Sequence, residues 1–182
     1  MNRSAKVLLL PGWHNSGPAH WQSCWERTHG YVRVQQHDWE RPLRGDWLMQ
    51  LEAAVLDAQQ DEVILVAHSL GCIQLAAWAT HSRHTQGIKA ALLVAPADVE
   101  CDTLRVQLPS WSPIVRQALP FKSVLVASAN DPLCAWAQSV ALACDWGATL
   151  VDAGHIGHIN TESDLGNWPQ GHALLMGLQQ SN

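Results

Sequence analysis

The sequence is poor in charged residues and has no basic cluster. Only 15% of its 182 residues are charged, and 11 lysines and arginines face 16 aspartates and glutamates, which gives a formal net charge of −5. Domains that bind nucleic acid usually carry a basic patch or stripe. The composition therefore argues against a nucleic-acid partner.

Long apolar runs are missing as well. A helix that crosses a membrane needs about 20 consecutive apolar residues, and no stretch of the chain approaches this length. The first six residues lead straight into the short apolar run 7–10, without the length or cleavage pattern of a signal peptide. We therefore expect a cytoplasmic protein with no membrane span.

The cysteines are odd in number, and no two of them form a Cys-x-x-Cys pair. The five are Cys24, Cys72, Cys101, Cys134 and Cys144. This pattern indicates reduced thiols and gives no sign of a disulfide framework or a zinc site. Phenylalanine and tyrosine occur once each, whereas tryptophan occurs ten times. We expect most of the tryptophans in the core and a few in a pocket.

What the chain does contain is a regular alternation of strand and helix patterns. A hydrophobic fraction of 47% and the lack of low-complexity tracts suit one globular domain, residues 1–182. The predicted strands cover residues 7–10, 31–34, 63–67, 88–94, 123–127 and 149–151. The predicted helices cover residues 18–30, 46–58, 70–84, 133–146 and 169–178. Such alternation predicts an α/β fold with a mostly parallel sheet and helices on both faces.

One segment departs from this alternation. Residues 97–120, together with the adjacent Pro96, contain four prolines and at most a weak helical pattern. We interpret the segment as an irregular excursion over the sheet edge that could form a small lid.

The segment 63–72, Val-Ile-Leu-Val-Ala-His-Ser-Leu-Gly-Cys, carries the clearest functional signal. An apolar strand breaks at a serine, and a helical pattern follows, which is the context of the nucleophile elbow. The usual spelling is Gly-x-Ser-x-Gly, and Ala67 takes the place of the first glycine. Strand and helix nearly touch at such a turn, so Ala67 and Gly71 meet the need for small residues on both sides of Ser69.

A serine hydroxyl needs a base to take its proton and an acid to orient that base. Ser69, Asp131 and His158 each follow a predicted strand, in the chain order typical of α/β-hydrolases. Asp131 could instead act only as a helix cap. Asp98 and Asp152 are less well placed, because Asp98 precedes the irregular segment and Asp152 lies close to the base itself.

Two histidines compete for the role of base. His155 and His158 lie in the same glycine-rich loop, and we favour His158 because Gly157 gives it room to approach the serine. A metal hydrolase that uses these two histidines with Asp152 and Asp131 is a weaker alternative. Its histidine spacing is a poor zinc signal, and no second cluster completes the site.

An acyl-transfer enzyme also needs donors for the oxyanion that forms during attack. The backbone N–H of Leu70, directly after the nucleophile, is one candidate. The loop after an early strand normally supplies the other. The Pro11-Gly12-Trp13 sequence suits this role, with the N–H of Trp13 as donor and Gly12 allowing the chain to turn.

Several motifs together resemble one known family. They are Leu-Leu-Leu-Pro-Gly-Trp at 8–13, His-Trp at 20–21, Val-Ala-His-Ser-Leu-Gly-Cys at 66–72, Leu-Pro-Phe at 119–121, Ser-x-Asn-Asp-Pro-x-Cys at 128–134, Gly-His-Ile-Asn-x-x-Ser at 157–163 and Trp-Pro-x-Gly at 168–171. In order and content they resemble the retinoblastoma-binding-protein-9-like (YdeN-type) serine hydrolases, over about residues 7–171. The resemblance implies a compact α/β-hydrolase domain with a short or absent cap. It also implies a triad carried here by Ser69, Asp131 and His158. The Leu-x-Cys-x-Glu motif through which the vertebrate member binds pocket proteins is absent, so that partner is not expected.

We therefore expect a serine hydrolase that cleaves a small ester or amide without a metal or organic cofactor. The short chain predicts an open site for small or flexible acyl groups. Candidate pocket residues are Gly12, His14, His68, Trp39 and Trp111. A binding or scaffold protein that retains the fold, and an acyltransferase with the same triad, stay open as alternatives. The natural substrate and the oligomeric state stay open too.

Overall fold

A computed structural model describes residues 5–58 and 61–180 of the chain. In this part of the chain, six strands form one sheet in the order β2-β1-β3-β4-β5-β6, and every pairing is parallel. The strands are β1 (Lys6–Leu10), β2 (Val32–Arg33), β3 (Val63–His68), β4 (Ile88–Val94), β5 (Lys122–Ala127) and β6 (Thr149–Asp152). The prediction of a parallel α/β sheet is confirmed.

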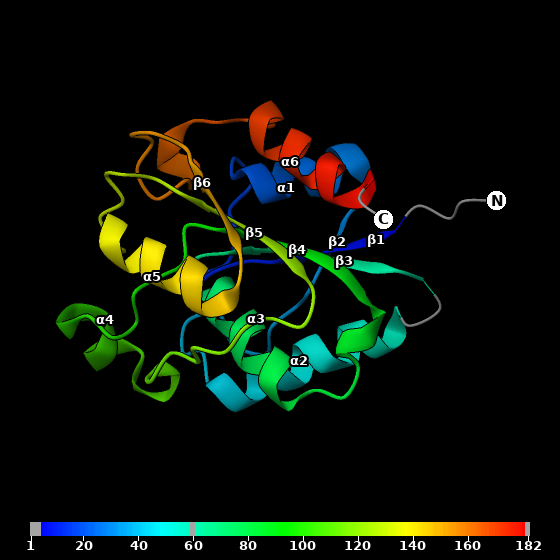
Figure 1. Ribbon diagram of the computed structural model, residues 1–182, viewed down its shortest axis with the longest axis horizontal. Coiled ribbons are helices and arrows are strands. Elements are labelled where there is room, and N and C mark those ends of the chain that lie inside the picture. The colour runs from blue at the N-terminus through cyan, green and yellow to red at the C-terminus, as the bar shows by residue number, and fades with distance from the viewer. Residues whose placement is uncertain (1–4, 59–60, 181–182) are drawn as a thin grey trace.

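Helices cover both faces of this sheet (Figure 1). They are α1 (Trp21–His29), α2 (Arg44–Asp57), α3 (Leu70–His81), α4 (Asp102–Gln107), α5 (Trp136–Trp146) and α6 (Pro169–Gln180). Short 3-10 helices are η1 (Thr85–Gly87), η2 (Pro109–Trp111) and η3 (Thr161–Ser163). None of the helices in residues 5–58 and 61–180 has the length and apolarity that crossing a bilayer requires.

The period of two along the strands sends alternate side chains into two separate cores. Leu8 and Leu10 of β1 belong to the core shared with α2, α3 and α5, whereas Val7 and Leu9 belong to the core shared with α1 and α6. The central strands are apolar on both faces because both faces are covered. Tryptophan supplies much of the bulk, and Trp21, Trp25, Trp47, Trp78, Trp111 and Trp146 are all fully buried.

The strand order places a switch point between β1 and β3. From β1 the chain moves outward to β2, and it then returns across β1 to form β3 on the other side. In open parallel sheets, ligands bind beyond the carboxyl ends of the strands at such a point. The loop after Leu10 and the turn at Ser69 meet here, since Leu10 pairs with Ala67 in the sheet register.

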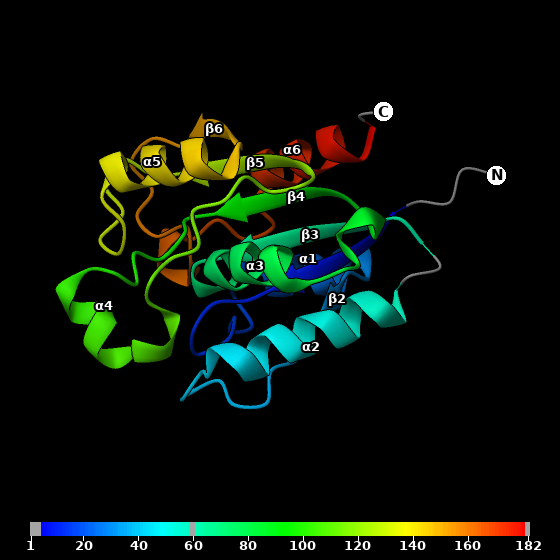
Figure 2. The same cartoon turned by 60° about the horizontal axis from the view of Figure 1, so that its bottom comes forward.

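The segment between β4 and β5, residues 95–121, is held against the rest of the molecule by several hydrogen bonds. It contains α4 and η2, which lie at the carboxyl ends of the strands (Figure 2). Trp111 donates from Nε1 to the carbonyl of Pro42 at 2.8 Å, and Trp146 donates to the carbonyl of Val115 at 2.8 Å. Arg116 bonds the carboxylates of Glu100 and Asp145. The segment thus contributes a small helical cover, as the weak helical pattern suggested.

Two predicted helix starts are wrong. Asp46 is not the cap of α2, since Leu43 precedes its first turn and Asp46 lies inside it, where a carboxylate suits the helix dipole. Helix α5 begins at Trp136 and not at residue 133, because Asp131 accepts the N–H of Leu133 at 2.8 Å and turns the chain.

Candidate active site

Ser69 lies on a sharp turn between β3 and α3. Its backbone has φ 55° and ψ −120°, a region that non-glycine residues rarely occupy. Its N–H donates to the carbonyl of Val94 at 3.0 Å, which continues the register of β3 and β4 through the turn. The turn therefore holds a strained serine at the carboxyl end of the central sheet, as an elbow requires.

Two glycines that pack near this serine, Gly71 of the elbow and Gly12 of the loop after β1, have no room for a side chain. A Cβ at Gly71 would lie 2.3 Å from the carbonyl oxygen of Leu10 and 2.9 Å from that of Pro11. A Cβ at Gly12 would lie 2.8 Å from the Cβ of Ser69 and 3.2 Å from its Oγ. The requirement for small residues that the motif predicted is thus a close approach of the elbow helix to the end of β1.

Ser69, His158 and Asp131 form one chain of hydrogen bonds. Nε2 of His158 lies 2.8 Å from Oγ of Ser69, and Nδ1 lies 2.9 Å from each carboxylate oxygen of Asp131. An ionised carboxylate only accepts, so Nδ1 donates to Asp131 and leaves Nε2 free to accept the serine proton. The side chains of His158 and Asp131 are only 6% and 2% exposed, so water competes little for these bonds.

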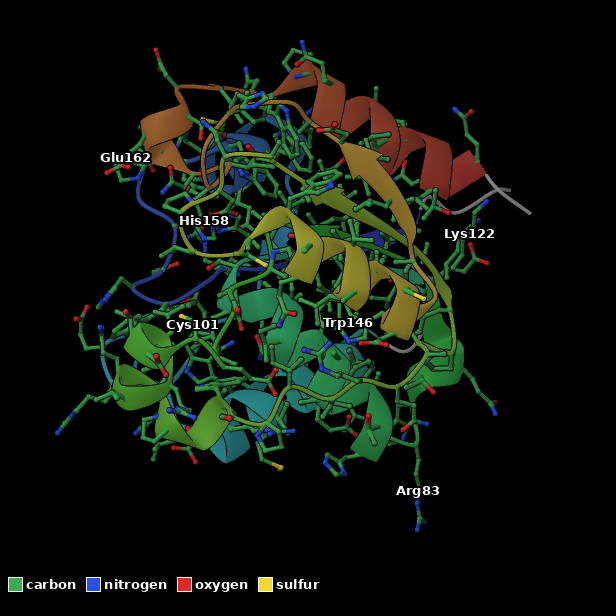
Figure 3. The ribbon with its side chains drawn as sticks, turned by 60° about the vertical axis from the view of Figure 1, so that its left-hand side comes forward. Arg83, Cys101, Lys122, Trp146, His158 and Glu162 are labelled. Atoms are coloured by element: carbon green, nitrogen blue, oxygen red, sulfur yellow. The ribbon has the colours of Figure 1, made fainter. Side chains whose placement is uncertain are left out.

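The loop that carries His158 is positioned by Asn130 and Ser128, two residues from the same motif as Asp131. Oδ1 of Asn130 accepts from the N–H of Gly157 at 2.8 Å, and Oγ of Ser128 accepts from the N–H of Ile156 at 3.0 Å. Figure 3 shows His158 on this loop, with Glu162 of η3 at the outer edge. Asp131 orients the ring, while its two neighbours hold the backbone that bears it.

The competing candidates lie elsewhere. His155 is exposed on the surface of the loop. Asp98 accepts from Glu100 N–H and from Gln138, and Asp152 accepts from the N–H of Gly154, so both are used in local turns. In residues 5–58 and 61–180, no three histidine, cysteine, aspartate or glutamate side chains gather in a group that could hold a metal ion.

A cavity of about 240 Å³ opens beside Ser69. Trp13 and Leu70 both line it, and neither backbone N–H is engaged by an acceptor in the described part of the chain. Leu70 is also the first residue of α3, where the helix dipole favours negative charge. Both residues that the sequence analysis proposed as oxyanion donors therefore line the same cavity as Ser69.

The cavity has a polar wall and an apolar wall. The polar wall consists of His14, Asn15, His20, His68, Asn160 and Thr161, and the apolar wall of Ala97, Leu104, Leu108 and Leu133. Three of the pocket residues predicted from the sequence line the cavity, namely Gly12, His14 and His68. Trp39 and Trp111 do not: Trp111 is fully buried in the core, and Trp39 packs edge-on against Trp47. The sequence analysis missed Leu104 and Leu108 because they come from the segment with the weakest pattern, and it missed Leu133 because this residue was assigned to the start of a helix.

Two further histidines lie beneath the base as neutral rings. His68 is 5.0 Å from His158 between ring centroids, and His20 is 4.7 Å from His68. Burial lowers the pKa of His68 well below its ordinary value. Burial, and to a lesser degree the charges of Arg33 and His158, lower the pKa of His20 to about 3. Neither ring carries a charge near neutral pH that would repel a protonated His158.

Comparison with known proteins shows the family and the fold of the chain. The chain matches the serine hydrolase family over residues 7–177. A YdeN-like hydrolase from Pectobacterium atrosepticum has 29% sequence identity and a TM-score of 0.85, with 97% of this chain and 91% of that chain covered. The ydeN gene product from B. subtilis has 19% identity and a TM-score of 0.77, with 97% and 100% covered.

The fold also occurs in Est1E from Butyrivibrio proteoclasticus, whose structure holds ferulic acid. That protein has 15% identity and a TM-score of 0.73, with 96% of this chain and 90% of that chain covered. No match was found among curated protein sequences. Because the family match spans almost the whole chain, the protein belongs to the serine hydrolase family and has the α/β-hydrolase fold of the YdeN-like hydrolases.

Proposed function

We propose that the protein hydrolyses a small carboxylic ester or amide through an acyl-enzyme on Ser69. The observation that carries this proposal is the unbroken chain of contacts from Asp131 through His158 to Ser69, at 2.9 and 2.8 Å. A serine becomes a nucleophile when a base is in hydrogen-bond reach and a third group orients that base. Both conditions support Ser69 as the nucleophile, and Ser69 and His158 line the cavity.

In the first half of the reaction, Oγ of Ser69 attacks the acyl carbonyl, and Nε2 of His158 takes its proton. Asp131 stabilises the imidazolium that results, because both of its oxygens face Nδ1. His158 then passes the proton to the leaving alcohol or amine. In the second half, His158 takes a proton from the water that attacks the acyl carbon. It then gives this proton to Oγ of Ser69 as the bond between Oγ and the acyl carbon breaks and the acid is released.

The oxyanion of each tetrahedral intermediate is stabilised by the N–H groups of Trp13 and Leu70. Preorganised donors of this kind favour the transition state over the ground state, because they point at charge that only then develops. Both residues line the cavity at Ser69. The first turn of α3 adds the positive end of its dipole.

The cavity walls favour a substrate with a short apolar part. Leu104, Leu108 and Leu133 give one wall an apolar surface, and the volume of about 240 Å³ limits the size of the group that packs there. The polar wall suits the more hydrated part of the substrate. We therefore infer that short-chain esters are processed better than long-chain ones.

The proposal is tested by labelling with a fluorophosphonate probe and by hydrolysis of p-nitrophenyl acetate. Ser69→Ala removes the nucleophile, so labelling should be lost. His158→Ala should lower kcat by several powers of ten while the chain stays folded. His155→Ala is the matched control, because this exposed histidine comes from the same loop and should leave both readouts unchanged.

The outcomes separate the candidate functions. Folded native protein that is neither labelled nor active would contradict the proposal and favour a binding role. Products analysed with added alcohol or amine distinguish hydrolysis from acyl transfer, since a transferase gives the new ester or amide in preference to the free acid.

A further inference from the structure

The guanidinium group of Arg33 uses all five of its N–H donors within the protein. Nε and Nη2 bond Oε2 of Glu26 at 3.1 and 2.6 Å, and Nη2 also bonds Oγ of Ser23 at 2.6 Å. Nη1 bonds Oδ1 of Asn15 at 2.6 Å and the carbonyl of Ser16 at 2.9 Å. The side chain is only 9% exposed. Arg33 therefore joins α1 to the loop that follows β1.

That loop is the one that carries Trp13. Its turn is closed by a bond from the N–H of Asn15 to the carbonyl of Gly12 at 3.1 Å, with Trp13 and His14 between them. His14 and Asn15 both have positive φ, 64° and 66°, so the turn contains two adjacent strained residues. Strained backbone persists only when its surroundings fix it. The bond from Arg33 to the Asn15 side chain is one such restraint.

The same network reaches the elbow. Oγ of Ser16 donates to Gln22 at 2.7 Å, and Nε2 of the fully buried Gln22 donates to the carbonyls of Leu10 and Val66, each at 3.2 Å. These carbonyls come from the ends of β1 and β3, the strands that lead to Trp13 and to Ser69. A buried polar network whose members are all paired holds one arrangement well. It therefore fixes the loop relative to the nucleophile.

We propose that Arg33 is a positioning residue that preorganises the Trp13 N–H of the oxyanion hole, acting through Asn15 and Ser16. The inference rests on the proposed function, since it assumes that the N–H of Trp13 donates to the oxyanion. Lysine cannot replace arginine in this role. It offers three donors from one atom, whereas the contacts of Arg33 spread over a planar fork that reaches α1 and the loop at once.

The contacts of Arg33 fall into two groups with different consequences. Those to Glu26 and Ser23 attach it to α1 and contribute to stability. Those to Asn15 and Ser16 reach the loop and set where Trp13 lies. A residue of purely structural importance would change the free energy of unfolding without changing kcat of the folded enzyme. A residue that positions an oxyanion donor changes kcat and leaves KM nearly constant, because the donor acts in the transition state.

The experiment measures kcat, KM and urea unfolding for Arg33→Lys with p-nitrophenyl acetate. We expect kcat to fall about 10- to 100-fold with KM within about threefold, below the loss seen when an oxyanion donor is removed outright. Arg27→Lys is the matched control, because Arg27 is an exposed arginine of α1 whose side chain donates a hydrogen bond to Sγ of Cys24. Its kinetics should equal those of the native enzyme.

Asn15→Ala and the double variant with Arg33→Lys complete a double-mutant cycle, and Asn15→Ala by itself is a test that does not depend on the folding of Arg33→Lys. Asn15→Ala alone should lower kcat to a similar degree, and the double variant should lose little more than either single variant. A folded Arg33→Lys with unchanged kcat, a loss that appears only in KM, or fully additive effects would each overturn the inference. Should Arg33→Lys not fold, unchanged kcat in Asn15→Ala would overturn it. Native protein without Ser69-dependent labelling would instead overturn the proposed function.

Discussion

The ring of His68 forms a hydrogen bond with the backbone carbonyl of His158, so the ring of His158 stays available to Ser69 and Asp131. Nε2 of His68 lies 3.0 Å from the backbone carbonyl of His158, and a carbonyl can only accept, so the His68 ring is the donor. His68 directly precedes Ser69 in the chain. The bond therefore joins the backbone of His158 to the end of β3, directly before Ser69. It limits the distance between the base and the nucleophile, which are far apart in the sequence.

His68→Phe should lower both activity and stability. Phenylalanine keeps an aromatic ring but has no donor, so the carbonyl of His158 loses this partner in a buried position, which costs about 1–3 kcal/mol. We expect kcat for p-nitrophenyl acetate to fall about tenfold or more through misplacement of His158. Urea unfolding followed by tryptophan fluorescence reports the stability. Native kcat in folded His68→Phe would show that the bond does not position the base.

Gly12→Ala should inactivate a folded protein. The added methyl would lie 2.8 Å from the Cβ of Ser69 and 3.2 Å from its hydroxyl, inside the space that the substrate carbonyl needs. Gly17→Ala is the control from the same loop, because a Cβ there meets nothing within 4 Å. We expect at least a 100-fold loss of kcat/KM for Gly12→Ala only. Equal kinetics of the two variants would contradict this description of the site.

Gly71→Ala should destabilise the fold. Its Cβ would lie 2.3 Å from the carbonyl oxygen of Leu10, which is backbone and cannot rotate away. Overpacking of this kind costs about 1–3 kcal/mol or more. Gly45→Ala is the matched control in an exposed position of α2, and it should stabilise by about 0.5–1 kcal/mol. The two free energies of unfolding should change with opposite signs, and a stabilised Gly71→Ala would refute the close-contact argument.

These glycines explain which parts of the site the sequence could predict. Gly71 has to be small because it lies against the carbonyl oxygens of Leu10 and Pro11, far earlier in the chain. Every nucleophile elbow needs small residues beside its serine, so a short motif predicts this contact although the partner strand is distant. Arg33 and Asn15 are 18 positions apart in the sequence, and nothing in either residue type announces their bond. Trp111 was named as a candidate pocket residue, yet tertiary packing buries it completely. A contact that a known motif requires can be predicted from the sequence, whereas the choice between pocket and core depends on side-chain packing that no motif records.

Stability should fall as the pH drops below about 6.5, in part because of His20. The pKa of His20 is lowered to about 3 in the folded protein, while an unfolded histidine has a pKa of about 6.5. The unfolded chain therefore binds a proton first, and acid favours unfolding. Between pH 7 and pH 5 this group alone should cost about 2 kcal/mol, at most about 1.4 kcal/mol per pH unit. Urea unfolding at several pH values measures it.

The variant His20→Asn distinguishes the contribution of His20 to the pH dependence of stability from that of the other titrating groups. Asparagine is a good helix cap and can accept the N–H of Gln22 as Nδ1 of His20 does, at 3.1 Å. The variant should keep most of the stability at pH 7 and lose less of it at pH 5. His37→Asn, at an exposed position, should keep the native pH dependence. An identical pH dependence in His20→Asn and the native protein would refute the assignment.

Leu104 should control which acyl chains the enzyme accepts. It comes from α4, is 7% exposed and forms part of the apolar wall, whereas Val106 of the same helix is 78% exposed and does not line the cavity. Leu104→Ala enlarges the cavity, so the ratio of kcat/KM for p-nitrophenyl hexanoate to that for the acetate should rise about tenfold, the usual value of one or two methylenes in an apolar pocket. Val106→Ala should leave the ratio unchanged. If the ratio did not move in Leu104→Ala, the acyl chain would have to lie elsewhere, and the polar wall would be the remaining surface beside Ser69.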